Sequence, residues 1–136
     1  MPEQPITTAA TDTFVWSPNQ MITRLGGDEE LARQLITLFI QECPRMMEQV
    51  RESVQQGTPD LVRRAAHAFK GSVSNFIAEG PTATAYALES IGRDGRTADA
   101  AAVLARLERE VEILMSQLRA FEAAFACRAS ARQAHE

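Results

Sequence analysis

The stretch from Pro59 to Glu79 reads PDLVRRAAHAFKGSVSNFIAE and is strongly two-sided. At 100° per residue, its apolar side chains gather on one side of a helix: Val62, Ala65, Phe69, Val73 and Phe76. His67 lies on the other side, within about 60° of these residues: Asp60, Arg63, Arg64, Lys70, Gly71, Ser74 and Ala78. The pattern predicts an amphipathic helix that exposes His67.

The segments around this stretch predict further helices, and none alternates as a strand would. A short helix should begin at Ser17-Pro18 and end at Gly26-Gly27. We expect the others over Asp28 to Gly57 with a kink at Pro44, over Pro81 to Ile91 before a turn at Gly92 to Gly95, and over Ala98 to Phe125. Within the helix over Pro81 to Ile91, three side chains should face inward: Ala87, Leu88 and Ile91.

The last of these helices repeats apolar residues in a heptad pattern from Leu104 to Phe125. In a chain of 136 residues, this seam is expected to close an all-α, antiparallel four-helix bundle with a short additional N-terminal helix. A homodimer through the same seam is the alternative, although we expect a monomer. Residues 1–13 are predicted to be a flexible leader, residues 14–126 the bundle, and residues 127–136 a frayed tail.

Composition excludes several classes of function. A net charge of -4 disfavours nucleic-acid binding, and no apolar run approaches the roughly 20 residues of a membrane span. The first residues lack the features of a signal peptide, so we expect a cytoplasmic protein. Cys43 and Cys127 are then expected to be reduced thiols.

The spacing of His67, Lys70 and Gly71 indicates a site of chemistry. A neutral imidazole is a good nucleophile, and residues three apart share a helix face, so that the ammonium of Lys70 could offset the charge of an attached phosphoryl group. Gly71 in mid-helix costs roughly 1 kcal/mol relative to alanine, which suggests that something must approach the helix there. These residues suit a phosphoryl carrier.

Other motifs indicate less. Gly26-Gly27-Asp28-Glu29 matches the core of a cyclic-dinucleotide synthase motif, but here it lies between two helices and suits a helix N-terminus. His67 lacks partners at metal-ligand spacing, so no metal site is expected. The sequence contains no glycine-rich phosphate-binding loop, so we expect no bound nucleotide or other cofactor.

At these residues the chain resembles the histidine-containing phosphotransfer (HPt) domains of bacterial phosphorelays. The resemblance centres on Ala66-His67-Ala68-Phe69-Lys70-Gly71-Ser72 and is supported by three further stretches: Leu25 to Leu31, Leu88-Glu89 and Gly92-Arg93. Ile77 departs from the family, which often has glycine there. We expect this difference to alter the docking face without abolishing transfer.

The resemblance implies that His67 is the phosphorylated histidine, on Nε2, with Lys70 as its charge partner and Gly71 as the clearance position. It implies no kinase activity in this chain, whether free-standing or part of a larger hybrid sensor kinase. The implied partners are receiver domains of response regulators and hybrid sensor kinases, which supply an aspartate and Mg²⁺. Receivers are expected to dock over a face formed by Arg63, Arg64, Ser74 and Asn75. The alternative is a docking module that binds or sequesters a receiver domain, or another regulator, without transferring phosphate.

Overall fold

The computed structural model describes residues 16–134 and the side chains of residues 16–127, so that the predicted leader over residues 1–13 lies outside the described residues. Within residues 16–134 the chain forms helices and no strand, which confirms the all-α prediction. The four long helices are α3 (Glu29–Gln56), α4 (Pro59–Val73), α5 (Glu79–Asp94) and α6 (Ala100–Ala134). The short ones are α2 (Pro18–Arg24), η1 (Ser74–Phe76) and η2 (Thr97–Asp99).

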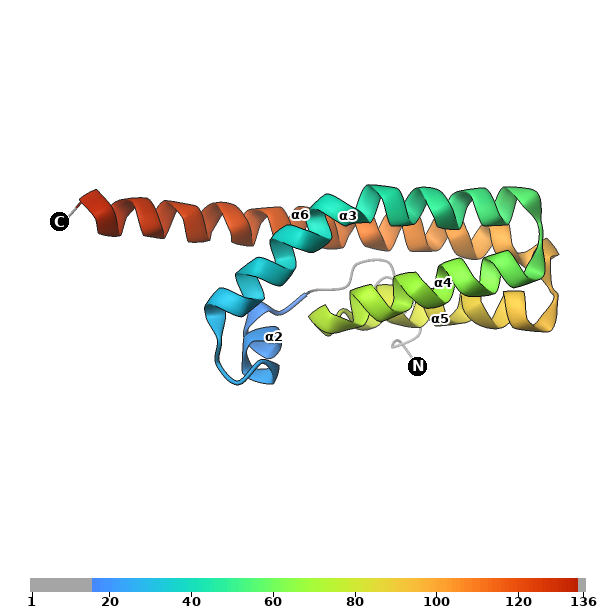
Figure 1. Cartoon of the computed structure of the whole chain (residues 1–136), viewed down its shortest axis with the longest axis horizontal. Coiled ribbons are helices and arrows are strands. Elements are labelled where there is room, and N and C mark those ends of the chain that lie inside the picture. The colour runs from blue at the N-terminus through green and yellow to red at the C-terminus, as the bar shows by residue number, and fades with distance from the viewer. Residues whose placement is uncertain (1–15, 135–136) are drawn as a thin grey trace, which may run out of the picture.

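The four long helices form an antiparallel bundle (Figure 1). Helix α4 packs between α3 and α5, and α6 closes the bundle by packing on both α3 and α5. Helix α2 lies at the end of the bundle where α3 begins (Figure 1) and contacts α3 and η1. This arrangement confirms the predicted bundle with one short additional helix before it.

Capping residues define the helix starts as the sequence predicted. The Ser17 side chain accepts a hydrogen bond from the backbone N–H of Gln20, and the Asp28 side chain accepts one from that of Leu31. Asp28 thus serves as a helix cap, as its position between two helices indicated. Gly57 ends α3 in the left-handed conformation, with φ of 68°. Helix α3 contains no break at Pro44. It bends part-way along its length (Figure 1), in line with the predicted kink.

The connection from α4 to α5 differs from the prediction. Helix α4 ends at Val73 instead of Glu79, because the chain turns through η1 and then through Ile77, which has a left-handed φ of 54°. Helix α5 begins at Glu79 and ends at Asp94, so that Gly92 is helical and not part of a turn. Pro81 did not mark the start of the helix because proline is tolerated anywhere in the first turn.

The last helix is longer than the sequence indicated. We expected fraying from residue 127, but α6 continues to Ala134. The segment from Ala100 to Ala134 contains no glycine or proline and is rich in alanine, leucine, glutamate and arginine, which favour helix.

The core lies between the four long helices and extends to the end covered by α2. Its largest fully buried side chains include Met21, Phe69, Phe76, Leu88 and Leu114. The heptad positions Leu104, Leu107, Val111, Leu114 and Leu118 are buried within the monomer, as expected for a bundle seam. Ala87, which we expected to face inward, is exposed because Leu88 and Ile91 fill that face of α5.

Two further findings bear on the sequence predictions. Both cysteines are free thiols, Cys43 buried and Cys127 exposed. Within the described residues, no helix is both long enough and apolar enough to cross a membrane.

Candidate functional site

Helix α4 presents His67 on the outer surface of the bundle. The buried side chains of this helix are Val62, Ala66, Phe69 and Val73, and they pack against the neighbouring helices. The opposite face therefore points outward, and the His67 side chain is 64% exposed. This confirms the predicted orientation of the helix.

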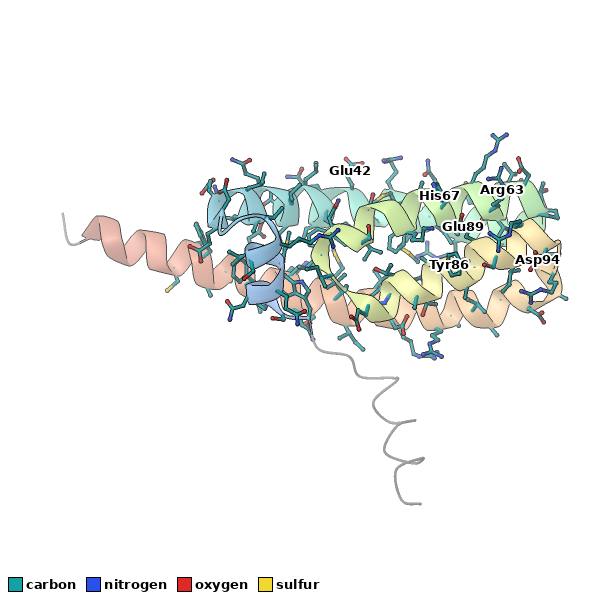
Figure 2. All side chains as sticks on the ribbon, turned by 90° about the horizontal axis from the view of Figure 1, so that it is seen from below. Glu42, Arg63, His67, Tyr86, Glu89 and Asp94 are labelled. Atoms are coloured by element: carbon teal, nitrogen blue, oxygen red, sulfur yellow. The ribbon has the colours of Figure 1, made fainter. Side chains whose placement is uncertain are left out.

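Glu89 of α5 lies directly beside His67 (Figure 2). One carboxylate oxygen, Oε2, is 3.0 Å from Nδ1 of His67, and the other, Oε1, is 2.9 Å from Nζ of Lys70. The Glu89 side chain is only 11% exposed. A single buried carboxylate thus connects the two residues that the sequence singled out.

The charge state of Glu89 determines what it can do. Burial alone would raise the pKa of the Glu89 carboxyl, but the hydrogen bonds from Lys70 and His67 outweigh it and hold that pKa below its ordinary value. The ionised carboxylate can only accept hydrogen bonds. The N–H at Nδ1 of His67 therefore donates a hydrogen bond to Glu89 and keeps its proton, so that the lone pair of a neutral imidazole lies on Nε2.

Lys70 is held in place from two sides. Besides its ion pair with Glu89, its Nζ lies 5.1 Å from the centre of the Tyr86 ring. The Lys70 side chain is 26% exposed. The structure therefore places a carboxylate between the imidazole and the ammonium, an arrangement that the spacing on α4 could not reveal.

A family model for the Hpt domain matches residues 34–121 of this chain. The chain belongs to the Hpt domain family. Hpt domains act in histidine phosphotransfer within phosphorelays, as phosphocarriers instead of kinases, and family membership supports that role for this chain.

Among solved structures, this Hpt domain is similar to histidine-containing phosphotransfer protein B (HptB) from Pseudomonas aeruginosa PAO1. The two share 22% identity with a TM-score of 0.73, over 80% of this chain and 95% of that chain. At this identity the likeness shows the shared fold alone. No sequence among curated proteins matches the chain.

The arginines of the predicted docking face of the Hpt domain are paired. Arg63 and Arg64 form ion pairs with the two carboxylate oxygens of Asp60, at 2.7 and 2.9 Å. The positive charges of Arg63, Arg64 and Lys70 near His67 are thus partly balanced by Asp60 and Glu89. These ion pairs lower the net positive charge that a partner would meet on this face.

The polar residues after Gly71 lie on two sides of the end of α4, with Ser72 and Asn75 towards α3 and Ser74 in a cleft that Lys70 and Tyr86 also line. The Ser74 hydroxyl donates to the Gly71 carbonyl at 3.1 Å, and Ser72 donates to the Met46 sulfur at 3.4 Å. Ser72 therefore hydrogen-bonds across the contact between α4 and α3. Asn75 is exposed and lines a small depression between α3 and the end of α4. The structure brings Ser74 and Asn75 to the end of α4, beyond Lys70.

Gly71 and Gly92 occupy opposite environments in the Hpt domain. A Cβ at Gly71 would meet nothing within 4 Å, so no contact within the domain requires glycine there. A Cβ at Gly92 would lie 2.5 Å from the backbone nitrogen of Arg63 and 2.7 Å from the carbonyl oxygen of Pro59. Gly92 therefore permits the close packing of α5 on α4, whereas the open space at Gly71 fits the predicted clearance for a partner.

Glu89 is a candidate site residue to which the sequence analysis gave no role, although it quoted the pair Leu88-Glu89. Its signal lay on α5, where Ala85, Leu88 and Gly92 are also buried and Glu89 is the one charged residue on that face. A carboxylate on the apolar face of a helix indicates a buried partner, because an unpaired buried charge is costly. Among the described residues, no group of His, Cys, Asp or Glu could hold a metal ion.

Proposed function

We propose that His67 accepts a phosphoryl group on Nε2 from the aspartate of one receiver domain and passes it to the aspartate of another. The observation that carries this proposal is the contact of 3.0 Å between Nδ1 of His67 and the buried carboxylate of Glu89. It keeps the proton on Nδ1 and leaves the Nε2 lone pair available on a side chain that is 64% exposed.

The transfer step needs no proton movement. The Nε2 lone pair attacks phosphorus, an N–P bond forms, and the P–O bond to the receiver's aspartate breaks, so that the aspartate leaves as a carboxylate. The imidazole ring then carries a positive charge with its proton still on Nδ1. Glu89 stabilises that charge through the same hydrogen bond. The reverse step returns the phosphoryl group to an aspartate.

The neighbouring residues have distinct proposed roles. Lys70 stabilises the phosphoryl charge, from a position fixed by Glu89 and Tyr86. Gly71 lets the receiver approach the helix next to His67. The receiver supplies Mg²⁺. We propose that the receiver docks over the face formed by Arg63, Arg64, Ser74 and Asn75.

The test uses the two histidines of the chain as a matched pair. Radiolabelled phosphoryl transfer from a phosphorylated receiver should label the wild type and the His135→Gln variant equally. It should not label the His67→Gln variant. Equal labelling of all three proteins would overturn the assignment of His67. If a receiver binds the wild type tightly but never labels it, the chain is a docking module instead of a carrier.

A further inference from the structure

Ile77 has the most unfavourable backbone conformation in the part of the chain that the structure describes. Its φ is 54°, and no other non-glycine residue between 16 and 134 has a positive φ. A β-branched side chain is poorly suited to the left-handed region, which glycine and asparagine adopt more readily. Such outliers persist only where the surrounding structure holds them, and they gather at functional sites.

Trp16 holds the backbone immediately before Ile77. Its indole N–H donates to the carbonyl oxygen of Phe76 at 2.9 Å, within the peptide unit that joins Phe76 to Ile77. Trp16 is only 5% exposed, and its ring packs edge-on against Phe121 with centroids 5.9 Å apart. A buried residue distant in sequence therefore fixes the corner between α4 and α5.

The Ile77 side chain is half-buried and lines a cleft next to the His67 site. The cleft has a volume of about 540 Å³, and both Lys70 and Tyr86 line it as well. The exposed Arg24 of α2 and the exposed Glu79 of α5 also line the cleft, together with Ala78 and Ala83. The cation that faces Glu89 is thus shared between the proposed phosphoryl site and this cleft.

We propose that Ile77 determines which receiver domains use His67, by contacting an apolar side chain of the docked receiver in this cleft. Trp16 acts as its positioning residue. Glycine would adopt this backbone conformation without strain. The half-buried Ile77 side chain leaves part of its apolar surface exposed, and we assign that surface to the contact with the receiver. A receiver fits this site because the carboxylates that hold its Mg²⁺ would face Lys70 and Arg24. This inference rests on the proposed function.

The test separates docking from chemistry by using two phosphoryl donors. Ile77→Asn and Ile77→Gly both suit a left-handed residue but remove the apolar side chain. Each should raise the receiver concentration that gives half-maximal transfer roughly tenfold, the effect of losing a small apolar contact. Phosphoramidate is a donor too small to contact Ile77 while it reacts with His67, so its rate of labelling should remain that of the wild type. The control is Ile113→Ala, which shortens a half-buried isoleucine on α6 and should change neither.

Wild-type half-saturation for both Ile77 variants would overturn the inference while leaving the proposed function intact. Failure of the wild type to be labelled by either donor would instead overturn the proposed function. The positioning role of Trp16 has its own test, in which Trp16→Phe is made with and without Ile77→Asn. As a single substitution, Trp16→Phe should raise the receiver concentration that gives half-maximal transfer. Added to Ile77→Asn, it should cause no further increase. Equal effects in both backgrounds would contradict that role.

Discussion

Replacement of Glu89 by glutamine is the sharpest probe of the site. The amide keeps the size of the side chain but removes the charge that pairs with Lys70 at 2.9 Å and with His67 at 3.0 Å. Hydrogen bonds to charged groups contribute about 1.5–3 kcal/mol, which corresponds to roughly 10- to 100-fold in rate. His67 is 64% exposed, so water screens this contact and we expect the low end, about a tenfold slower transfer.

The assay is the rate of radiolabelled transfer from a saturating phosphorylated receiver, measured by rapid quench. The matched control is Glu108→Gln, which removes a carboxylate that pairs with Arg51 at 2.6 Å on another face and should leave transfer unchanged. If Glu89→Gln transfers at the wild-type rate, the carboxylate holds the helices together without assisting the imidazole, and our reasoning about Nε2 is wrong.

The same variant has a predicted pH signature. The lowered pKa of Glu89 means that its ion pairs stabilise the folded state above the unfolded-state pKa of about 4.3. That contribution is lost as the pH falls through the lower folded-state pKa. The contribution of the ionised Glu89 to the difference in unfolding free energy between wild type and Glu89→Gln should therefore be fully present above about pH 4.3. It should shrink below about pH 4, as urea titrations at several pH values would reveal.

Three further outcomes are expected. Gly71→Ala should stabilise the fold by about 1 kcal/mol in urea unfolding but slow transfer from a receiver. Gly92→Ala should instead destabilise the fold by about 1–3 kcal/mol, because its Cβ would clash with the main chain of α4. Equal transfer rates for Gly71→Ala and wild type would contradict the clearance role of Gly71. Lys70→Ala should keep the helical circular dichroism spectrum and slow transfer roughly tenfold, and an unchanged rate would show that the cation does not contribute. Burial raises the pKa of Cys43 to about 11, so a thiol reagent should modify Cys127 rapidly in the native protein and Cys43 only after unfolding.

The sequence predicted the features of the fold that depend on local periodicity and capping. The two faces of α4, the cap at Asp28 and the left-handed end of α3 at Gly57 all follow from neighbouring residues. The start of α5 did not, because Pro81 suits several positions in a first helical turn and the residue that fixes the corner is the distant Trp16.

The site was only partly predictable for a related reason. The exposure of His67 follows from the pattern of one helix, but its partner Glu89 is 22 residues away on another. Only the packing of α5 on α4, made close by Gly92, brings the carboxylate to Nδ1. The charge environment of Lys70 could therefore not be predicted from the residue pattern of one helix.

The most direct test of the central claim is to locate the phosphoryl group within the imidazole of His67. Nitrogen NMR of the ¹⁵N-labelled protein, after transfer from a receiver, distinguishes the two ring nitrogens. We predict an N–P bond at Nε2 and a retained proton at Nδ1, both on the resonances that disappear in His67→Gln. A phosphoryl group on Nδ1, or on any residue other than His67, would contradict the account.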